Sequence, residues 1–192
     1  MSREIRCFWV VDTGRDRAFL RRFVFRAEGG ACPGPMGTHD AMVPIEEMSG
    51  DEPIVSSRQS PPGFESDPRW PTRCSCGYEF KPEDNWQVFR TSIYKRPDTN
   101  EEWDFRSLPA GAMYDAEWLH GDGGKRVGPD GLALHVVCPP GASWGDHWHV
   151  DGPANNGPGW TRTGTVPNIT ANPSIQTPRY HGWLRNGVLV KC

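Results

Sequence analysis

Three cysteines and one histidine have the residue types and spacing of a zinc site. Cys32 and His39 lie in one short stretch, and Cys74 and Cys76 lie together further along the chain. Thiolate and imidazole are the ligands that a structural zinc ion prefers, and four protein ligands leave no position for water. The single residue between the last two cysteines can point away while both thiols face one ion. The sequence therefore predicts one structural Zn²⁺ held by Cys32, His39, Cys74 and Cys76, with buried free thiols as the alternative.

A second set, His147, His149 and Asp151, has the spacing of a strand face. Alternate residues of an extended strand point to the same side of the sheet. Two such imidazoles, joined by His135 or His181, could hold a metal ion with an open position, and a neighbouring carboxylate could act as a base. This set predicts a metal-dependent hydrolase as an alternative function. A polar strand face without chemistry explains the same residues.

A third set, Cys138, His181 and Cys192, could form a second zinc site. Cys192 is the last residue of the sequence, where fraying works against a ligand, so free thiols are the expectation. The sequence contains no phosphate-binding loop, no nucleophile elbow, no His-Glu-x-x-His helix and no dinucleotide-binding glycine pattern. These observations favour a protein that is not an enzyme.

The amino-acid composition of the chain limits the classes of function that it could have. The 192 residues carry a net charge of -3, which gives no general reason to expect nucleic acid or an anionic membrane as a partner. No apolar run approaches the ~20 residues that a membrane span needs. The first residues form no apolar signal segment, so a virion or a host cytoplasm is the expected location. In a reducing compartment, cysteines are more often metal ligands or free thiols than disulfides.

Arginines gather near the N-terminus and provide a further alternative. They could contact nucleic acid or phosphate. We expect instead a solvated strand face whose guanidinium groups pair with the acidic segment that follows. The residues of this cluster are Arg15, Arg17, Arg21, Arg22 and Arg26.

The sequence predicts a predominantly β fold of the α+β class, forming a single domain over residues 1–192. With 22 glycines, 19 prolines and nine tryptophans, the composition is typical of short strands joined by elaborate turns. We expect a zinc-clasped part at 1–80, an aromatic-rich part at 81–120 and a β part at 121–192. The first of these contains a long acidic loop at 46–68, whose ends the metal would hold together.

Local patterns predict individual elements. Strands are expected at 7–11, 19–26, 41–45, 102–106, 132–138 and 146–152, with a short helix at 19–23 as the alternative to the second of these. Turns are expected at 12–14 and 155–159, a helix at 83–93, and a turn into a short helix over 108–118. An Asn-Gly turn at Asn186 and Gly187 predicts a hairpin over 180–192.

The C-terminal part carries a series of short motifs: Trp160-Thr161-Arg162-Thr163-Gly164, Pro167, Asn172-Pro173-Ser174-Ile175, Tyr180-His181-Gly182-Trp183-Leu184 and Asn186-Gly187-Val188. Together they resemble the end of an uncharacterised family found in phages and bacteria, whose members are often labelled ammonia monooxygenase. Where that family has a Cys-Pro-x-Cys pair, this sequence keeps only Cys138, and Tyr180 stands where the family has a cysteine. The segments Arg21-Arg22-Phe23, Cys32 to His39 and Cys74 to Tyr78 likewise resemble small proteins of actinobacteria and their phages that have no assigned activity.

The resemblance implies phage association and a metal-binding, β-rich fold, and it implies no reaction. Together with the residues, it predicts a non-enzymatic, zinc-stabilised structural or interaction protein that is phage-encoded, either a virion component or an accessory factor. Its expected partners are other phage or host proteins, which exposed tryptophan-rich loops could contact. The hydrolase at His147, His149 and Asp151 and the nucleic-acid-binding protein remain the two alternatives.

Overall fold

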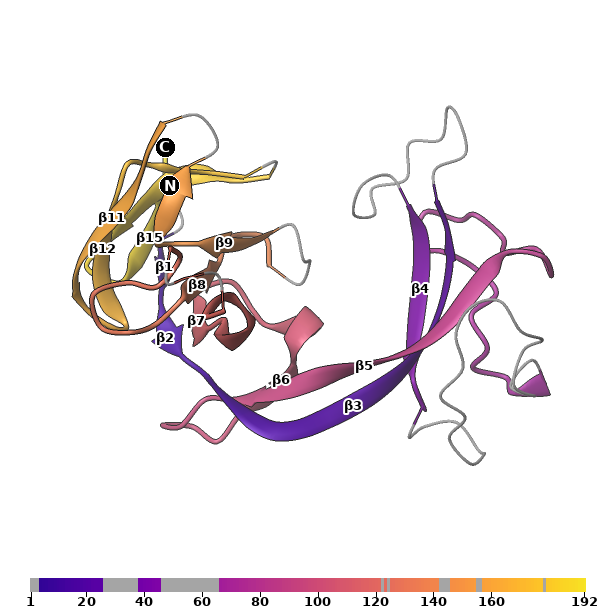
Figure 1. Cartoon of the computed structure of the whole chain (residues 1–192). Coiled ribbons are helices and arrows are strands. Elements are labelled where there is room, and N and C mark those ends of the chain that lie inside the picture. Colours follow the sequence, from indigo (N-terminus) through magenta and orange to yellow (C-terminus); the bar gives the residue numbers. More distant parts are fainter. Residues whose placement is uncertain are drawn as a thin grey trace. The chain divides into compact units, whose positions relative to one another are not determined.

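The structure is a computed structural model that describes residues 4–25, 38–45, 66–121, 123, 125–141, 146–154, 157–177 and 179–192, without the side chains of residues 89 and 152–160. The fold is mostly β with largely antiparallel sheets, which confirms the predicted fold class (Figure 1). The described residues include two short 3-10 helices, η4 (Phe105–Ser107) and η5 (Glu117–Leu119). Each has three residues. The predicted acidic loop at 46–68 lies outside the described residues except for its last three positions.

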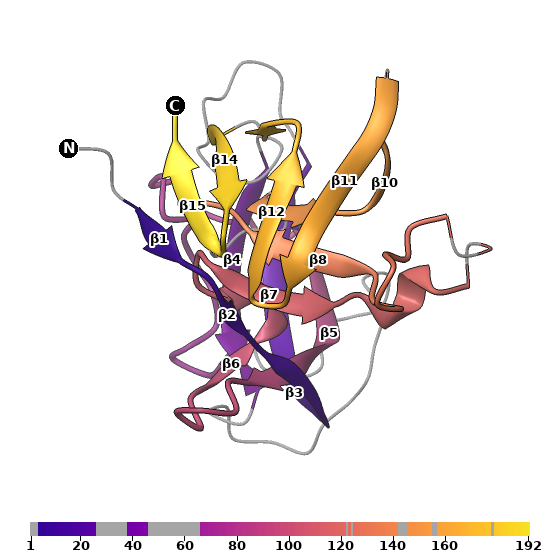
Figure 2. The same cartoon turned by 90° about the vertical axis from the view of Figure 1, so that its left-hand side faces the viewer.

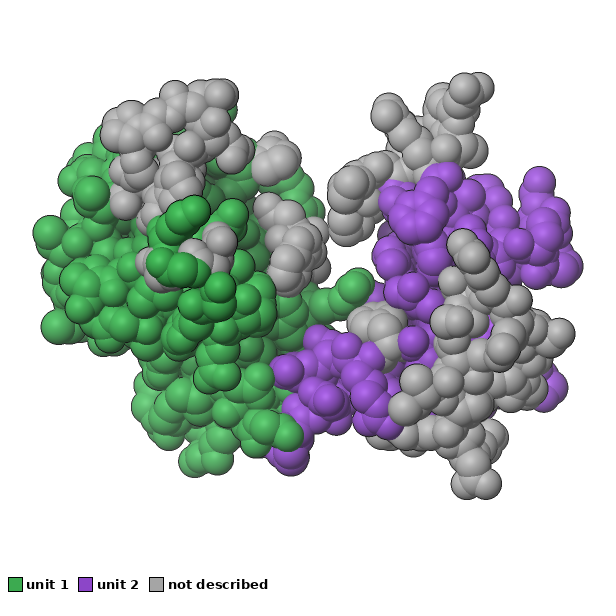
Figure 3. Space-filling view, in the orientation of Figure 1, with its two compact units in different colours: residues 1–14, 93–192 green, residues 15–92 purple. Residues whose placement is uncertain are grey.

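The chain divides into two compact units, which Figure 3 colours separately. Unit 1 comprises Met1–Gly14 and Ile93–Cys192, and unit 2 comprises Arg15–Ser92. Two long strands, β3 (Val11–Val24) and β5 (Asn85–Lys95), continue from one unit into the other. The three parts expected from the sequence do not coincide with these units, and the single domain stays a prediction.

The central sheet of unit 1 is buried on both faces. It consists of four strands in the order β2 (Phe8–Trp9), β7 (Ala112–Asp115), β8 (Leu134–Val137) and β9 (His147–His149). Because side chains alternate across a sheet, Met113 and Val136 enter one hydrophobic cluster, whereas Ala112, Tyr114 and Val137 enter another. This two-sided burial explains the continuous apolar run before Cys138.

The first of these clusters is closed by the C-terminal strands, several of which lie side by side in Figure 2. One sheet has the order β1 (Ile5–Arg6), β15 (Val188–Lys191), β14 (His181–Arg185) and β13 (Ile175–Gln176). Another has the order β10 (Gly152–Ala154), β11 (Gly157–Thr165) and β12 (Asn168–Asn172). The predicted hairpin is confirmed as β14 and β15, with φ of 45° at Asn186 and 70° at Gly187. The β11–β12 hairpin was not predicted.

The second cluster lies against the end of β5 and the segment that follows it. β6 (Glu102–Asp104) pairs with the last residues of β5, and Ile93 lies opposite Asp104. Val10, Tyr94 and Leu108 complete the apolar interior here. Unit 1 therefore buries apolar side chains on both sides of its central sheet.

In unit 2, β3 lies between β4 (His39–Pro44) and β5. The antiparallel register of β3 and β4 runs from Phe19 opposite Pro44 to Val24 opposite His39. Leu20 packs with Trp86 in a small buried cluster, confirming a strand rather than a helix at this point. The alternation of the strand places Leu20 and Val24 on the same face, and His39 lies opposite Val24.

The helix predicted at 83–93 is wrong, because residues 85–93 belong to β5 and residues 83 and 84 form a turn before it. The 3–4 spacing of Trp86, Phe89 and Ile93 imitated a helix. Trp86 and Val88, two positions apart, instead contact the same cluster, which is the periodicity of a strand. Thr91 and Ile93 are β-branched and suit a strand better than a helix.

Two other local predictions also differ from the structure. The turn at 12–14 is wrong because β3 continues through it; Gly14 has a φ of +69° and donates its N–H to Asp12 Oδ1 at 2.8 Å, a local bend that does not reverse the chain. The helix expected within 108–118 is wrong for Ala112–Asp115, which forms β7, and only Glu117–Leu119 is helical. Pairing of β7 with β2 on one side and β8 on the other outweighs the local signal for a helix.

Close approach of the backbone in the C-terminal sheet gives a testable prediction. A Cβ at Gly182 would overlap both the Tyr180 hydroxyl and the carbonyl oxygen of Val190, whereas a Cβ at Gly121 meets no described atom. The Val190 carbonyl belongs to a paired strand, so moving it aside would disturb the pairing of β14 and β15. We expect Gly182→Ala to lower the free energy of unfolding by about 1–3 kcal/mol. Chemical denaturation measures this, with Gly121→Ala as the matched control. Equal stability of the two variants would contradict the packing described.

Candidate metal centre

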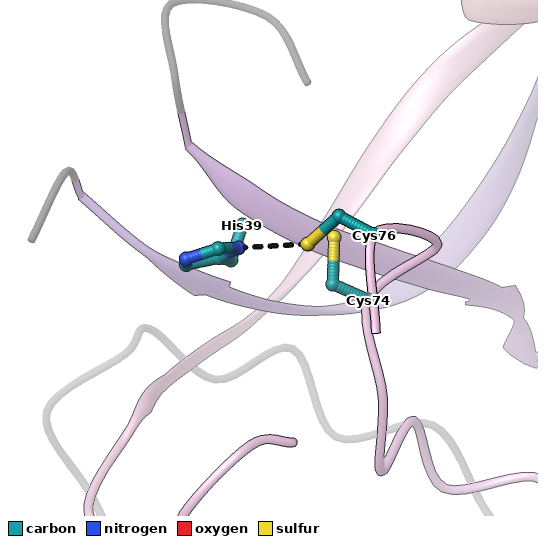
Figure 4. A group of neighbouring side chains, drawn as sticks. All are labelled: His39, Cys74 and Cys76. Atoms are coloured by element: carbon teal, nitrogen blue, oxygen red, sulfur yellow. Dashed lines mark hydrogen bonds between the residues drawn. The ribbon is translucent and has the colours of Figure 1, made fainter. Parts of the chain in front are cut away.

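Three potential metal ligands of unit 2 come together in space (Figure 4). His39 begins β4, while Cys74 and Cys76 lie in a short turn. Their ligand atoms are all within 4.8 Å of one another, and His39 Nδ1 is 3.2 Å from Cys76 Sγ. Ligands that each bind one zinc ion at about 2.0–2.3 Å must lie this close together. The group could therefore hold a metal ion, as the sequence predicted for these three residues. Cys32, the predicted fourth ligand, lies outside the described residues.

A tight turn positions the two thiols. The Cys74 N–H donates to the Tyr78 carbonyl at 2.8 Å, and the Gly77 N–H donates to the Cys74 carbonyl at 2.9 Å. Gly77 has a φ of +94°, a conformation that residues with a Cβ rarely adopt. The local backbone hydrogen bonds thus bring two cysteines separated by one residue to the same side of the turn.

The surroundings of Cys74 favour a thiolate. Burial alone would raise the pKa of this thiol. Hydrogen bonds from the backbone N–H groups of Cys76 and Asp40, together with the Cys76 and His39 side chains, lower that pKa to about 6. The Asp40 nitrogen lies 3.5 Å from Cys74 Sγ. The thiolate is the form of cysteine that binds metal, so its surroundings favour the metal-binding form of Cys74.

Aromatic packing holds the imidazole in place. The Tyr78 ring stacks on the His39 ring with centroids 4.1 Å apart and an angle of 9° between the planes. The Tyr78 hydroxyl donates to Asp84 Oδ2 at 3.1 Å, which fixes the far end of the ring. Phe80 packs edge-on against Tyr78 and joins the small buried cluster that contains Cys74. Such supporting contacts orient the ligands of a metal site.

A buried arginine attaches the segment around this turn to β3. Arg22 donates to the carbonyl oxygens of Pro71 and Lys81. Its guanidinium group also lies over the rings of Trp70 and Phe80, at 5.3 and 5.2 Å from their centroids. Burial lowers the pKa of Arg22, against the opposite effect of nearby acids. This contact was not predicted, although an arginine within an apolar strand pattern was a visible signal.

The predicted basic cluster is therefore only partly a solvated surface. Arg22 is 4% exposed, and Arg21 donates from Nε to both carboxylate oxygens of Asp40, at 2.8 and 2.9 Å. Arg15 and Arg17 are exposed, and Arg26 lies outside the described residues. The pairing of arginine with the following acidic segment is thus seen at Arg21.

The structure separates the members of the second predicted set, His147, His149 and Asp151. His147 and His149 share a face of β9, and the third nearby imidazole is His135, directly opposite His149 on β8. His181 lies instead on β14, with its Nε2 3.4 Å from the Ser174 hydroxyl. Burial lowers the pKa of all three imidazoles, to about 3 for His135 and about 4 for His147, so they are neutral near pH 7.

Asp151 turns to a different partner. Arg162 donates from Nε to both Asp151 oxygens, at 2.8 and 2.9 Å, and from a terminal nitrogen to Asp130 at 2.8 Å. The side chains of Arg162 and Asp151 are only 2% and 7% exposed. Asp151 therefore takes part in a buried ion pair that joins β11 to the residues after β9. This pair could not be predicted from the sequence, because Arg162 and Asp151 lie in separate segments that only the fold brings together.

The third predicted set is not assembled as a metal site. Cys138 is buried in the core of unit 1, and Cys192 is exposed. Among the residues that the structure describes, the group of His39, Cys74 and Cys76 is the one set of at least three such ligands drawn within 4.8 Å. Cys138 and Cys192 form no disulfide in the structure.

Comparisons with protein-family models, with curated proteins and with solved structures found no match. The described residues contain no helix of the length and apolarity needed to cross a membrane. The interpretation of the metal centre therefore depends on its own geometry and chemistry.

Asp151 provides a test of structural against catalytic roles. We expect Asp151→Asn to lower the free energy of unfolding by about 3–5 kcal/mol, because it leaves the buried Arg162 charge incompletely paired. Asp98→Asn is the matched control: its partner is Arg96, the pair lies at the surface, and this change should leave the stability nearly unchanged. Thermal or chemical unfolding measures both. An Asp151 variant as stable as the control would contradict the structural role.

Proposed function

We propose that this protein is a zinc-stabilised structural or interaction protein rather than an enzyme. The observation that carries the proposal is the convergence of His39, Cys74 and Cys76, with all ligand atoms within 4.8 Å. A histidine with two thiolates is a ligand set that suits zinc, and Cys32, close to His39 in sequence, would complete four protein ligands. A fully ligated zinc has no open position for substrate, so its contribution is to folding.

The packing of unit 2 supports a folding role for the metal. The buried cluster beside the ligands consists of Cys74 and Phe80, with Val24, Ala41 and Tyr78 packed against it. So small an apolar interior contributes little to stability, and small folds commonly add a metal for this reason. Binding an ion that only the folded state can hold adds its binding free energy to folding.

Exposed aromatic side chains support the interaction role. Trp118 is 53% exposed and Phe25 is 70% exposed. Aromatic residues are enriched at protein interfaces, where they supply large contact areas. Phage association, whether as a virion component or an accessory factor, and phage or host proteins as partners stay predictions that rest on the sequence resemblance.

Zinc removal tests the proposal. Cys76 is exposed, so Cys76→Ser removes a ligand with little loss of packing, unlike a change at the buried Cys74. We expect this variant to bind about one zinc ion fewer per chain than the wild type, because the site loses a thiolate ligand. Its melting temperature should fall to that of the chelator-treated wild type. Elemental analysis and thermal unfolding with and without chelator measure the two effects.

Cys192→Ser is the matched control, since Cys192 is also exposed and lies outside the site. This variant should keep the zinc content, the melting temperature and the chelator response of the wild type. Cys32→Ser tests the fourth ligand and should weaken zinc binding. A Cys76 variant with wild-type zinc content and stability would overturn the proposal.

A further inference from the structure

A second cluster of potential ligands lies in unit 1, where three imidazoles occupy one face of the β8–β9 pair. His135 belongs to β8, and His147 and His149 belong to β9. We propose that these three histidines form a second site, for a divalent transition-metal ion of the kind that imidazole prefers. The site is separate in sequence and chemistry from the cysteine-containing group of unit 2.

The register of the two strands places the histidines as neighbours. His135 lies opposite His149, and Val137 lies opposite His147. The backbone hydrogen bonds from Cys138 to Asp146 and from Val150 to Leu134 flank these positions. His135 and His149 therefore form a non-hydrogen-bonded pair, the kind whose side chains approach most closely in an antiparallel ladder. Their ring centroids are 5.0 Å apart.

The third histidine completes the face along β9. His147 is two residues before His149, so both side chains leave the same side of the strand, and His147 is diagonal to His135. Two ligands from one strand and one from its neighbour give a facial set of three nitrogens. His149 is partly exposed, so an ion from solvent would reach the site on its side, whereas His147 Nε2 is buried.

Hydrogen bonds set which nitrogen of each ring would bind. His149 Nε2 is 3.0 Å from the Arg126 carbonyl, and His135 Nδ1 is 3.4 Å from the Ala133 carbonyl. A carbonyl only accepts, so each of these nitrogens carries the proton and the other nitrogen of its ring carries the lone pair. Metal-bound histidines characteristically donate their second ring N–H to an oxygen in this way.

His147 has an equivalent arrangement with a buried tyrosine. Its Nδ1 is 2.9 Å from the Tyr114 hydroxyl, which can accept a proton from Nδ1; in that tautomer Nε2 carries the lone pair and would bind the ion. Tyr114 is fully buried and packs edge-on against Phe105, which also contacts the His147 ring at 4.8 Å between centroids. The aromatic interior thus holds one ligand firmly. In the structure the nitrogens of the three rings do not all lie within 4.8 Å of one another, so the side chains would have to turn toward a shared ion.

All-imidazole ligation distinguishes this site from the first. Three nitrogen ligands suit Zn²⁺, Co²⁺, Ni²⁺ or Cu²⁺ and leave at least one position for water or another ligand. Asp151, the carboxylate expected beside these histidines, is occupied by Arg162. The site is therefore a three-histidine centre and not a set of two histidines and a carboxylate.

Cobalt substitution separates the two sites in one experiment. The full-length protein, stripped of metal, is titrated with Co²⁺ and followed by its absorption spectrum and by bound cobalt per chain. Thiolate ligation gives intense near-ultraviolet charge-transfer absorption, whereas an all-nitrogen site gives only weaker visible bands. We expect two equivalents in the wild type. His149→Gln should remove one equivalent and keep the thiolate absorption, while Cys76→Ser should remove the thiolate absorption and keep the other equivalent.

Two further variants guard against effects of folding. His120→Gln is the matched control, since His120 is exposed and lies 2.8 Å from Asp115 outside the cluster. It should keep both equivalents. Tyr114→Phe retains the ring but removes the oxygen that supports His147, and should weaken the second equivalent by about 10–100-fold.

The outcomes distinguish the two proposals. A wild type that binds one equivalent, lost in Cys76→Ser and unchanged in His149→Gln, would overturn the three-histidine site alone. One equivalent without thiolate absorption, lost in His149→Gln, would instead support it and contradict the zinc centre of unit 2. Retention of two equivalents by both His149→Gln and Tyr114→Phe would also exclude the histidine site.

Discussion

The contact of one imidazole with two thiols joins elements of unit 2 that share little else. His39 begins an edge strand, while the cysteines lie in a turn more than thirty residues later. Among the residues that the structure describes, the apolar cluster beneath them is small, and the cluster around Leu20 and Trp86 is separate from it. Hydrophobic burial scales with the area removed from water, so two small clusters cannot supply what one large core would. A bound ion would add a strong link between β4 and the turn.

The contacts around the ligands fit this interpretation. Arg22 reaches from β3 to backbone carbonyls on both sides of the turn, and Tyr78 covers the His39 ring. Backbone N–H groups directed at Cys74 favour its thiolate form. Each of these contacts positions a ligand or stabilises its metal-binding form. The described surroundings of the three residues therefore fit a group that could hold a metal ion.

The sequence identified these ligands because cysteine and histidine chemistry is local and specific. It could not show that Asp151 pairs with Arg162, since Arg162 lies in the β11–β12 hairpin, which was not predicted. The mistaken helix at 83–93 has a related cause. Spacing alone suited Trp86, Phe89 and Ile93 to a helix, but pairing with neighbouring strands determined the structure. Local patterns predicted the β-rich class and the Asn-Gly hairpin because these depend on composition and on turn geometry.

The two ligand groups differ in the way expected of structural and accessible metal sites. Sulfur ligands at the ends of a turn enclose an ion and join separate segments, as His39, Cys74 and Cys76 would. Imidazoles in a row on a sheet require no new link, because β8 and β9 are already paired through their backbones. An ion there would add little to folding and would keep a free coordination position. The packing of the two units matches this contrast. Unit 2, with the small core, has the thiolates, whereas unit 1, with a sheet buried on both faces, has the histidines. A functional ligand or partner that binds through a metal ion would therefore be expected at the histidines of unit 1, and stability that depends on metal at the cysteines of unit 2.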